Sequence, residues 1–223
     1  MRNVMRSLLK TAVLCSAITM AYSQSPSLVW LLPFPGAPDN PMLGGEWSRA
    51  HDITPDGSHV VGRAYFGGLE SVFLASVWYS SGANPVSLGT LGVCDEPPGV
   101  VLNWSWAYGV SADGSTVVGV SGCYAGWVLH YAFRWTGGSM QNLGTLGGAL
   151  SWAHDVSADG SVVVGWANNP RGDTRAFVWT PREGMRDLGT LGGRHSMATG
   201  VSSDGRRIVG WAERPDGKVR AVL

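Results

Sequence analysis

The chain has 223 residues, enough for one large domain or two small ones. Only 14% of the residues are charged, and the 16 basic and 16 acidic side chains cancel in number. With 32 glycines and 11 tryptophans, this low charge favours a turn-rich all-β chain over a helical or disordered one.

The N-terminal 23 residues have the layout of an export signal. A basic stretch at residues 1–10 precedes an apolar run at residues 11–20, and small residues follow up to Ser23. The apolar run is about ten residues long, too short to span a bilayer as a helix. We therefore predict a signal peptide at residues 1–23, no membrane span in the mature chain, and a secreted, periplasmic or cell-surface location.

Cleavage of this signal changes the charge balance. It would remove three basic and no acidic residues, leaving 13 basic against 16 acidic side chains and a net charge of −3. A mildly acidic chain lacks the positive surface that nucleic acids attract, so we expect no nucleic-acid partner.

A ten-residue pattern, "VSADGSVVVG" in one copy, recurs four times. Its aspartates are separated by 57, 46 and 45 residues, which gives a period of about 45 residues. These aspartates are Asp56, Asp113, Asp159 and Asp204. The longer first spacing places an insertion at residues 93–103, after the first "LGTLG" motif.

Each repeat divides into four short β-like pieces separated by Gly, Asn, Asp and Pro. In the third repeat the pieces are "AHDVS", "SVVVGWA", "RAFVWT" and "MRDLGTL". The Asp-Gly pair between the first two is typical of a tight hairpin turn. Four strands in about 45 residues make one propeller blade. We therefore predict an all-β, propeller-like array of about four four-stranded blades.

The predicted boundaries follow from the repeat. Residues 24–46 form a partial repeat at the N-terminal end. The repeats proper are 47–104 with the inserted loop, 105–150, 151–195, and 196–223, which lacks its fourth strand. One hypothesis is that a strand within residues 28–43 completes the last blade. Its register is ambiguous, and the rival interpretation is a truncated piece of a larger exported protein.

The repeated motifs carry a family resemblance. The "VSxDGSxVVG" and "LGTLGG" motifs, with "YAF" at residues 131–133 and "RAF" at residues 175–177, resemble the HAF repeat of bacterial extracellular repeat proteins. The resemblance covers about residues 28–223 and implies secretion and a propeller-like β-fold. It implies no known reaction and no catalytic residues. The "TPDG" turn at residues 54–57 also resembles propeller repeats of the TolB type.

Two cysteines remain after the predicted signal. Cys94 lies in the insertion and Cys123 in a predicted loop of the second repeat. An even pair in an oxidising compartment favours a disulfide, which would tie the inserted loop to the neighbouring repeat. The alternative is two unpaired thiols.

Candidate chemistry is sparse. Each repeated Asp stands beside Gly without the dense oxygen ligands of a calcium loop, so we interpret it as a turn residue. The pairs His51-Asp52 and His154-Asp155 occupy one repeat position, which holds Tyr108 in the second repeat, and this indicates an adaptable surface or cavity-lining position. No nucleophile elbow, phosphate-binding loop or zinc motif is present in the sequence. We predict no catalytic residue, no metal site and no cofactor.

The tryptophans recur at fixed repeat positions, which mainly indicates packing between blades. Trp104 and Trp127 do not follow the repeat. We expect Trp104 in the inserted loop and Trp127 in the loop beside Cys123, and both are candidates for ligand contact. The alternative for both is burial beside the disulfide.

These patterns favour a secreted, non-enzymatic scaffold that binds a glycan or a surface protein. The alternative is a hydrolase or lyase acting on extracellular polysaccharide. A propeller can build such a site at its mouth from residues that do not repeat.

Overall fold

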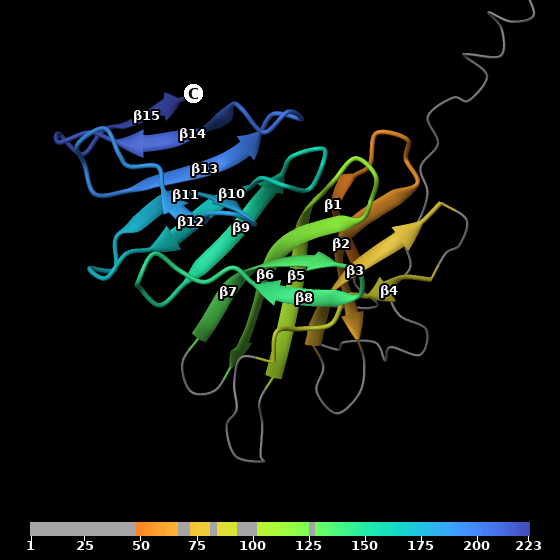
Figure 1. Cartoon of the computed structure of the whole chain (residues 1–223). Helices are drawn as coiled ribbons and strands as arrows, with labels where there is room; N and C mark the ends of the chain where they lie inside the picture. Colours follow the sequence, from red (N-terminus) through yellow and green to blue (C-terminus); the bar gives the residue numbers. More distant parts are fainter. Residues whose placement is uncertain (1–47, 67–71, 81–83, 93–101, 125–127) are drawn as a thin grey trace, which may run out of the picture. The chain divides into compact units, whose positions relative to one another are not determined.

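The computed structural model describes residues 48–66, 72–80, 84–92, 102–124 and 128–223. Within these ranges the chain forms 15 β-strands and no helix, so the predicted all-β class is confirmed. The strands form four antiparallel sheets in chain order (Figure 1). Three sheets have four strands and the last has three, in agreement with the predicted propeller-like array.

Each sheet uses consecutive strands as neighbours, as short hairpin turns require. The first sheet comprises β1 (Ser48–Ile53), β2 (His59–Phe66), β3 (Val72–Tyr79) and β4 (Val86–Ser87). The second comprises β5 (Leu102–Val110), β6 (Thr116–Tyr124), β7 (Val128–Thr136) and β8 (Ser139–Asn142). The third comprises β9 (Ser151–Val156), β10 (Val163–Asn168), β11 (Thr174–Thr180) and β12 (Gly184–Asp187). The last comprises β13 (Ser196–Val201), β14 (Ile208–Glu213) and β15 (Val219–Val222).

Strands β5 and β6 of the second sheet extend further than the sequence motifs indicate. Asn103 pairs with Cys123, and Trp104 pairs with Gly122, in the ladder between β5 and β6. The expectation that Trp104 and Cys123 lie in loops is therefore wrong. The physical reason is the extended ladder, which supplies their backbone groups with hydrogen bonds that a loop would leave to water.

The repeated Asp-Gly turn joins the first two strands of every sheet and is held by its own side chains. In the third sheet, Ser157 Oγ donates to Asp159 Oδ1 at 2.6 Å, and the same oxygen accepts the N–H of Ser161 at 3.0 Å. Gly160 has a φ of 70°, a conformation that glycine adopts without steric cost. The same bonds recur around Asp56, Asp113 and Asp204. The aspartate is thus a structural turn residue, as predicted.

Neighbouring turns also bond to each other. The N–H of Ala112 donates to the carbonyl of Ala158 at 2.9 Å, and the N–H of Ala158 donates to the carbonyl of Ser203 at 3.1 Å. The ten-residue motif therefore closes each hairpin and also connects consecutive sheets.

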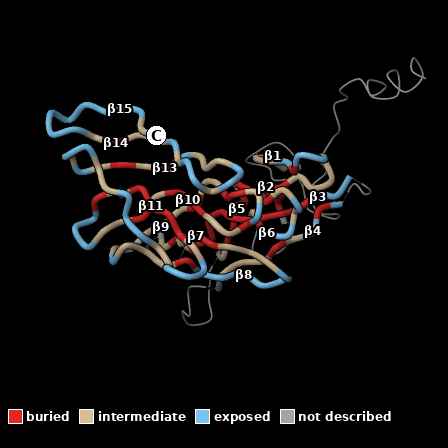
Figure 2. Tube along the Cα trace, turned by 45° about the horizontal axis from the view of Figure 1, so that its top comes forward, coloured by how far each residue is buried: buried red, intermediate tan, exposed pale blue. Residues whose placement is uncertain are grey.

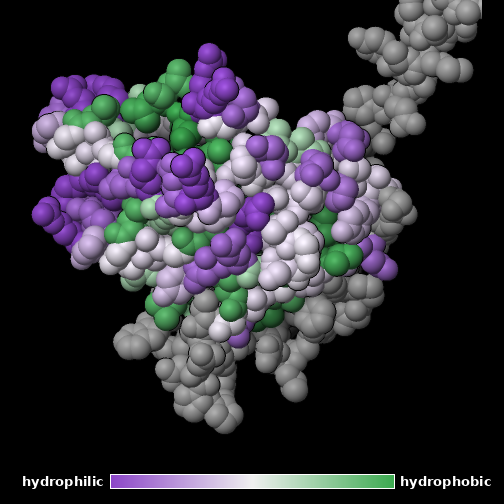
Figure 3. Space-filling view, viewed as in Figure 1, coloured by the Kyte–Doolittle hydropathy of each residue, from purple (hydrophilic) through white to green (hydrophobic). Residues whose placement is uncertain are grey.

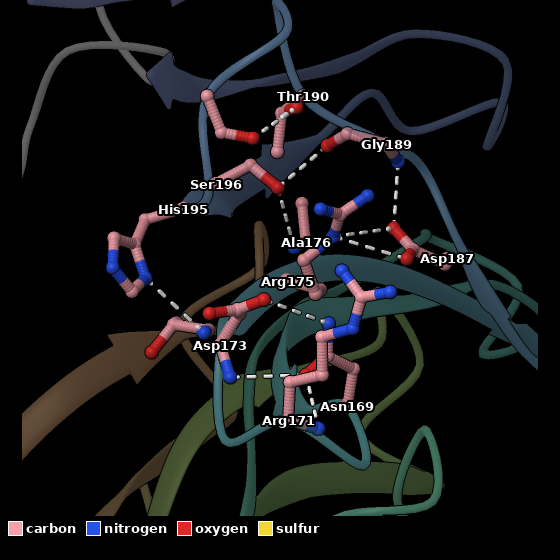
Figure 4. Close-up of polar contacts among 12 residues, drawn as sticks. Asn169, Arg171, Asp173, Arg175, Ala176, Asp187, Gly189, Thr190, His195 and Ser196 are labelled. Carbon is pink, nitrogen blue, oxygen red and sulfur yellow. Dashed lines mark hydrogen bonds and ion pairs between the residues drawn. The ribbon is translucent and has the colours of Figure 1, made fainter. Parts of the chain in front are cut away.

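A buried serine in the first strand links each later sheet to the one before it. Ser196 Oγ accepts the N–H of Ala176 at 2.9 Å and donates to the carbonyl of Gly189 at 2.6 Å (Figure 4). Ala176 lies in the third strand of the preceding sheet, and Gly189 lies in the "LGTLGG" segment that crosses between the sheets. One hydroxyl therefore satisfies two backbone groups that the sheet ladders leave unpaired.

The serine bridge repeats at the two preceding junctions. Ser105 accepts from Ala75 at 2.9 Å and donates to Gly89 at 2.6 Å. Ser151 accepts from Ala132 at 2.9 Å and donates to Gly144 at 2.5 Å. All three serines are buried. The recurring "S" of the repeat is therefore the junction residue between sheets.

Apolar side chains fill the same junctions. Each of the three hydrophobic clusters combines residues of two consecutive sheets. Between the second and third sheets lie Val118, Ala132, Leu143, Ala153, Val156, Val163, Ala167, Phe177 and Trp179. The hydrophobic core is thus divided among the junctions, and each sheet is buried by its neighbours (Figure 2).

The last sheet has one apolar face exposed. Val209 is 45% exposed, although Val118 and Val164, at the same repeat position, are fully buried. Hydrophobic surface lies among hydrophilic surface over this sheet (Figure 3). The hypothesis that residues 28–43 complete this sheet stays a prediction, because those residues lie outside the described ranges.

The turn aspartates predict an acid-sensitive fold. Their bonds to neighbouring hydroxyl and N–H groups lower the pKa of Asp113 and Asp159 to about 2, from an ordinary value of 3.8. A carboxyl with a lowered pKa stabilises the fold above its ordinary pKa, and that stabilisation is lost as pH falls toward 2. We expect the free energy of unfolding, measured by urea denaturation, to fall from about pH 4 to about pH 2. The contribution per turn is small because these carboxyls are exposed to solvent.

Asparagine variants separate the titration of the turn aspartates from other causes of acid unfolding. Asp113→Asn with Asp159→Asn keeps an acceptor oxygen in each turn but removes the titrating group, so the pH slope below 4 becomes shallower. Asp216→Asn is the control, because among the described residues that carboxylate accepts one long bond of 3.2 Å from the Lys218 N–H and otherwise has only ion pairs of 4.0 Å with Arg214 and Lys218. An unchanged slope in the double variant would contradict the assignment.

The serine bridge predicts a large cost for losing one hydroxyl. Ser151→Ala leaves the Ala132 N–H and the Gly144 carbonyl without that partner at a buried junction. We expect a loss of about 2–4 kcal/mol in the free energy of unfolding, measured by urea denaturation. Ser139→Ala, at an exposed position of β8, should change it by less than about 0.5 kcal/mol. Equal losses in the two variants would show that the bridge contributes little.

Candidate binding face on the first strands

The first strands of consecutive sheets contact one another, and each carries a β-bulge at the same repeat position. The pairing register shifts around His51, Tyr108, His154 and Thr199. A bulge leaves one residue unpaired and redirects its side chain. The variable repeat position, which holds His51, Tyr108, His154 or Thr199, is therefore the bulged residue of each first strand.

The glycine of the "VVG" motif makes the bulge possible. A Cβ on Gly165 would overlap the backbone carbonyl of Trp152, and one on Gly119 would overlap that of Trp106. Gly62 and Gly210 face carbonyls of their own first strands in the same way. Because no side chain fits there, the first strand can press against the second and turn its tryptophan and bulged residue to one side.

This contact predicts a steric penalty for Gly165→Ala. The overlapping atom belongs to the backbone and cannot rotate away, so the loss in unfolding free energy should reach the upper end of the about 1–3 kcal/mol seen for overpacked sites. Thermal or urea denaturation measures it. Gly217→Ala is the comparison, because Gly217 has a positive φ of 74° and its nearest neighbour atom is 4.0 Å away, so it carries a backbone cost without a close contact, whereas Gly165 has the close contact without a positive φ. A smaller loss in Gly165→Ala than in Gly217→Ala would contradict the close approach.

The redirected side chains form one connected group of rings, which we call the aromatic face. It consists of His51, Trp104, Trp106, Tyr108, His130, Trp152, His154 and Trp166. The rings come from the first three sheets. All but Trp104 and His130 are partly exposed.

Ring contacts run continuously across the sheet junctions. His51 and Tyr108 stack with centroids 4.5 Å apart and planes 5° apart. Tyr108 lies 5.5 Å from Trp152, and Trp106 lies 5.8 Å from Trp152. Rings from three consecutive sheets therefore share one surface, which the separate repeats cannot show in sequence.

Several polar atoms in this face have no hydrogen-bond partner within the described part of the chain. They are Nε1 of Trp106, Nε1 of Trp152 and Nε2 of His154, and each is closed off from solvent. A buried polar group without a partner costs about 1–3 kcal/mol. Native structures satisfy most such groups with hydrogen bonds. Three unpartnered nitrogens in one cluster therefore make this face a candidate binding site.

The histidines of the face are neutral near pH 7. Burial lowers the pKa of His154 and of His130. Burial also lowers the pKa of His51, whose bond to the Ala107 carbonyl at 2.6 Å works in the opposite direction. Because that partner is a carbonyl, His51 donates from Nδ1.

Two arginines border the face in the first sheet. The guanidinium of Arg63 lies 4.1 Å from the centroid of the Trp106 ring and 5.4 Å from that of Phe73. Arg49 is directly opposite Arg63 in the ladder between β1 and β2. Burial lowers the pKa of Arg63, the nearby Tyr108 raises it, and the charge of Arg49 lowers it further.

The aspartates beside the bulges accept hydrogen bonds from the next sheet. Asp52 Oδ2 accepts the N–H of Val110 in the next sheet at 2.9 Å, and Asp155 Oδ2 accepts that of Val201 at 2.8 Å. Burial raises the pKa of Asp155, while its bonds to Val201 and Val156 lower it. Among the described residues, no three metal-ligating side chains converge. The two His-Asp pairs are therefore split, with the histidine in the aromatic face and the aspartate in a junction.

The residues singled out in sequence have different outcomes. Trp104 is only 5% exposed and belongs to the aromatic face, where its ring lies 4.8 Å from that of Trp106. Cys123 is fully buried in β6 and disulfide-bonded. Its predicted partner Cys94 lies outside the described residues, as does Trp127. The pairing of Cys94 with Cys123 and the ligand roles of Trp104 and Trp127 stay predictions.

Sequence reasoning missed most of the aromatic face. It assigned the recurring tryptophans to packing and did not connect them with the variable His/Tyr slot. The available signal was their spacing, since Trp106 and Tyr108, like Trp152 and His154, are two residues apart in one strand. Alternate residues point to the same side of a strand.

A separate hollow of about 560 Å³ lies at the last sheet. Leu188, Leu191, Met197, Val209, Trp211 and Leu223 are among its lining residues. It contains none of the residues of the aromatic face. Its apolar lining belongs to the exposed face of the last sheet. The three nitrogens without partners lie in the aromatic face instead.

Comparisons with known proteins give structural likenesses at low sequence identity. No family model and no curated protein matches the chain. A protein assigned as TolB from Agrobacterium tumefaciens is 14% identical, with a TM-score of 0.48 over 86% of this chain and 68% of the other. TolB from Acinetobacter baumannii is also 14% identical, with a TM-score of 0.42 over 76% of this chain and 41% of the other.

A third likeness is to a protein assigned as a 6-phosphogluconolactonase from Bacteroides uniformis. It is 13% identical, with a TM-score of 0.30 over 89% of this chain and 60% of the other. The chain thus spans less than two thirds of the second and third proteins. At these identities the likenesses carry nothing on function, and the fold described above rests on the sheets themselves. No helix in the described residues has the length and hydrophobicity needed to cross a membrane.

Proposed function

We propose that this protein is a secreted or periplasmic, non-enzymatic repeat module of the HAF type that binds a glycan on its aromatic face. The observation that carries the proposal is the cluster of partnerless nitrogens on Trp106, Trp152 and His154 within partly exposed rings. The export signal and the repeat motifs of the sequence support the location and the family.

Sugars match the chemistry of such a face. A pyranose ring presents apolar C–H groups on its two faces and hydroxyls around its rim. Partly exposed indole rings provide flat apolar surface, and their N–H groups donate hydrogen bonds. Trp106 and Trp152 are in edge-to-face contact, with centroids 5.8 Å and planes 66° apart, so they offer both features in two orientations.

The unpaired nitrogens give binding a source of free energy. In the free protein each lacks a partner and is closed off from solvent. A small rotation of the rings would expose them to a sugar hydroxyl, which then supplies the missing bond. The cost of leaving them unpaired is removed on binding, and this favours the bound state.

The described contacts of serine and histidine do not favour the enzymatic alternative. Ser58 Oγ lies 2.6 Å from Nδ1 of its neighbour His59 and donates to Asp56 Oδ1 at 2.7 Å. The equivalent Ser115 and Ser161 make the same bond to their aspartates without a neighbouring histidine. Ser58 therefore has the same turn role as Ser115 and Ser161.

Phenylalanine variants test this proposal. Trp106→Phe and Trp152→Phe remove the indole N–H while keeping an aromatic ring. We expect glycan affinity, measured by isothermal titration calorimetry on hits from a glycan array, to fall about fivefold to thirtyfold, the value of one lost hydrogen bond. Stability should change little or rise, because each variant also deletes an unsatisfied buried donor.

The control is Trp211→Phe, which lies in the last sheet and outside the aromatic face. It should leave glycan affinity unchanged. An array and surface extracts with no hit would end the proposal. A glycan bound equally well by all three variants would place the site elsewhere on the chain.

A further inference from the structure

One cross-strand pair breaks the pattern of the aromatic face. At the position where β1 and β2 pair, the first sheet has Arg49 opposite Arg63. The corresponding pairs are Trp106 with Val120, Trp152 with Trp166, and Met197 with Trp211. Three sheets therefore place apolar residues where the first places two positive charges.

The two arginines lack a compensating anion in the described part of the chain. Neither takes part in an ion pair or a side-chain hydrogen bond among these residues. Asp52 is close in sequence, but its oxygens accept the N–H groups of Ile53 and Val110. Like charges directly opposite each other in a sheet are destabilising. A bound anion would relieve that repulsion.

The setting of Arg63 favours a carboxylate. Its guanidinium lies over the Trp106 ring at 4.1 Å, so the ring covers one face and the N–H groups project from the edge. That edge is a planar fork of donors, which matches the two oxygens of a carboxylate. Partial burial strengthens the pairing, since water screens the charges less.

We propose that Arg63 and Arg49 bind the carboxylate of an acidic sugar, a uronate, whose ring stacks on the aromatic face beside Trp106. This inference rests on the proposed glycan-binding function and specifies its ligand class. The aromatic rings recognise the sugar ring, and the arginine pair selects sugars that carry a carboxylate. Since neutral sugars lack the anion, they bind the same face more weakly.

The test uses the full chain with trigalacturonic acid and its methyl ester as probes. The ester keeps every ring and hydroxyl and removes only the charge. Titration calorimetry, with tryptophan fluorescence as a second readout, should show the acid binding at least about tenfold more tightly than the ester. The dissociation constant for the acid should rise with added NaCl, because salt screens the ion pair.

Variants assign the preference to the arginines. Arg63→Gln should bring the affinity for the acid down to that for the ester in the same variant. Arg63→Lys keeps the charge but not the fork, and should give an intermediate loss. Arg186→Gln is the matched control, because it removes the same charge from an exposed position in β12. Its affinity for the acid should equal that of the unaltered chain.

The outcomes separate this inference from the proposed function. Equal binding of acid and ester would overturn the uronate assignment and leave the glycan-binding function standing. If neither probe binds, while a neutral glycan from the array does, the uronate assignment is again overturned. If no glycan binds at all, both proposals fail. Tight binding of hexaglutamate, competing with the acid, would show simple charge attraction and refute the sugar class.

Discussion

The structure depends on a hydroxyl shared between consecutive sheets. Ser105, Ser151 and Ser196 each accept a backbone N–H from the third strand of the preceding sheet and donate to the carbonyl of the crossing segment. A single repeat sheet cannot bury its hydrophobic face alone. The serine fixes how two sheets meet, and the apolar clusters then fill that junction. Because every junction is local, stability is the sum of neighbouring contacts, as in other repeat proteins.

The aromatic face is a product of the same construction. Once the junctions fix the first strands side by side, the bulge and the "VVG" glycine turn the tryptophan and the bulged residue of each strand toward its neighbours. The repeat thus supplies a frame in which positions two residues apart can vary without affecting the junctions. At the tryptophan position of the first strand, the first sheet has Arg49 and the next two sheets have Trp106 and Trp152.

Sequence reasoning reached the features that local chemistry determines. The Asp-Gly turn, the four strands per repeat and the all-β class follow from short patterns, and the structure contains them. The serine bridge could not be found in the same way, because Ser151 meets Ala132, 19 residues earlier, only after two sheets have formed. Trp104 and Cys123 were misplaced for a related reason. Their strand conformation depends on the ladder between β5 and β6, which continues beyond the repeat motif.

The candidate face was harder still to predict. A bulge is a shift of pairing register, and no particular residue type in the sequence identifies it. Arg49 and Arg63 are 14 residues apart in the chain and become opposite partners only through the ladder between β1 and β2. The tryptophan spacing was visible, but both packing and binding favour tryptophan. The partnerless nitrogens, which distinguish the two, are known only from the structure.

The junction aspartates also determine how such a chain can change its length. Asp52 and Asp155 each reach the next sheet at a site where the bulge is followed by glycine, at Gly109 and Gly200. A Cβ on Gly200 would lie 3.6 Å from the Asp155 carboxylate, an ordinary van der Waals contact. Aspartate and glycine therefore alternate from sheet to sheet. Deleting one sheet would place two aspartates or two glycines at a single junction, whereas gain or loss of two sheets together preserves the alternation. At this one position the pattern therefore repeats every two sheets, twice the period seen in the sequence.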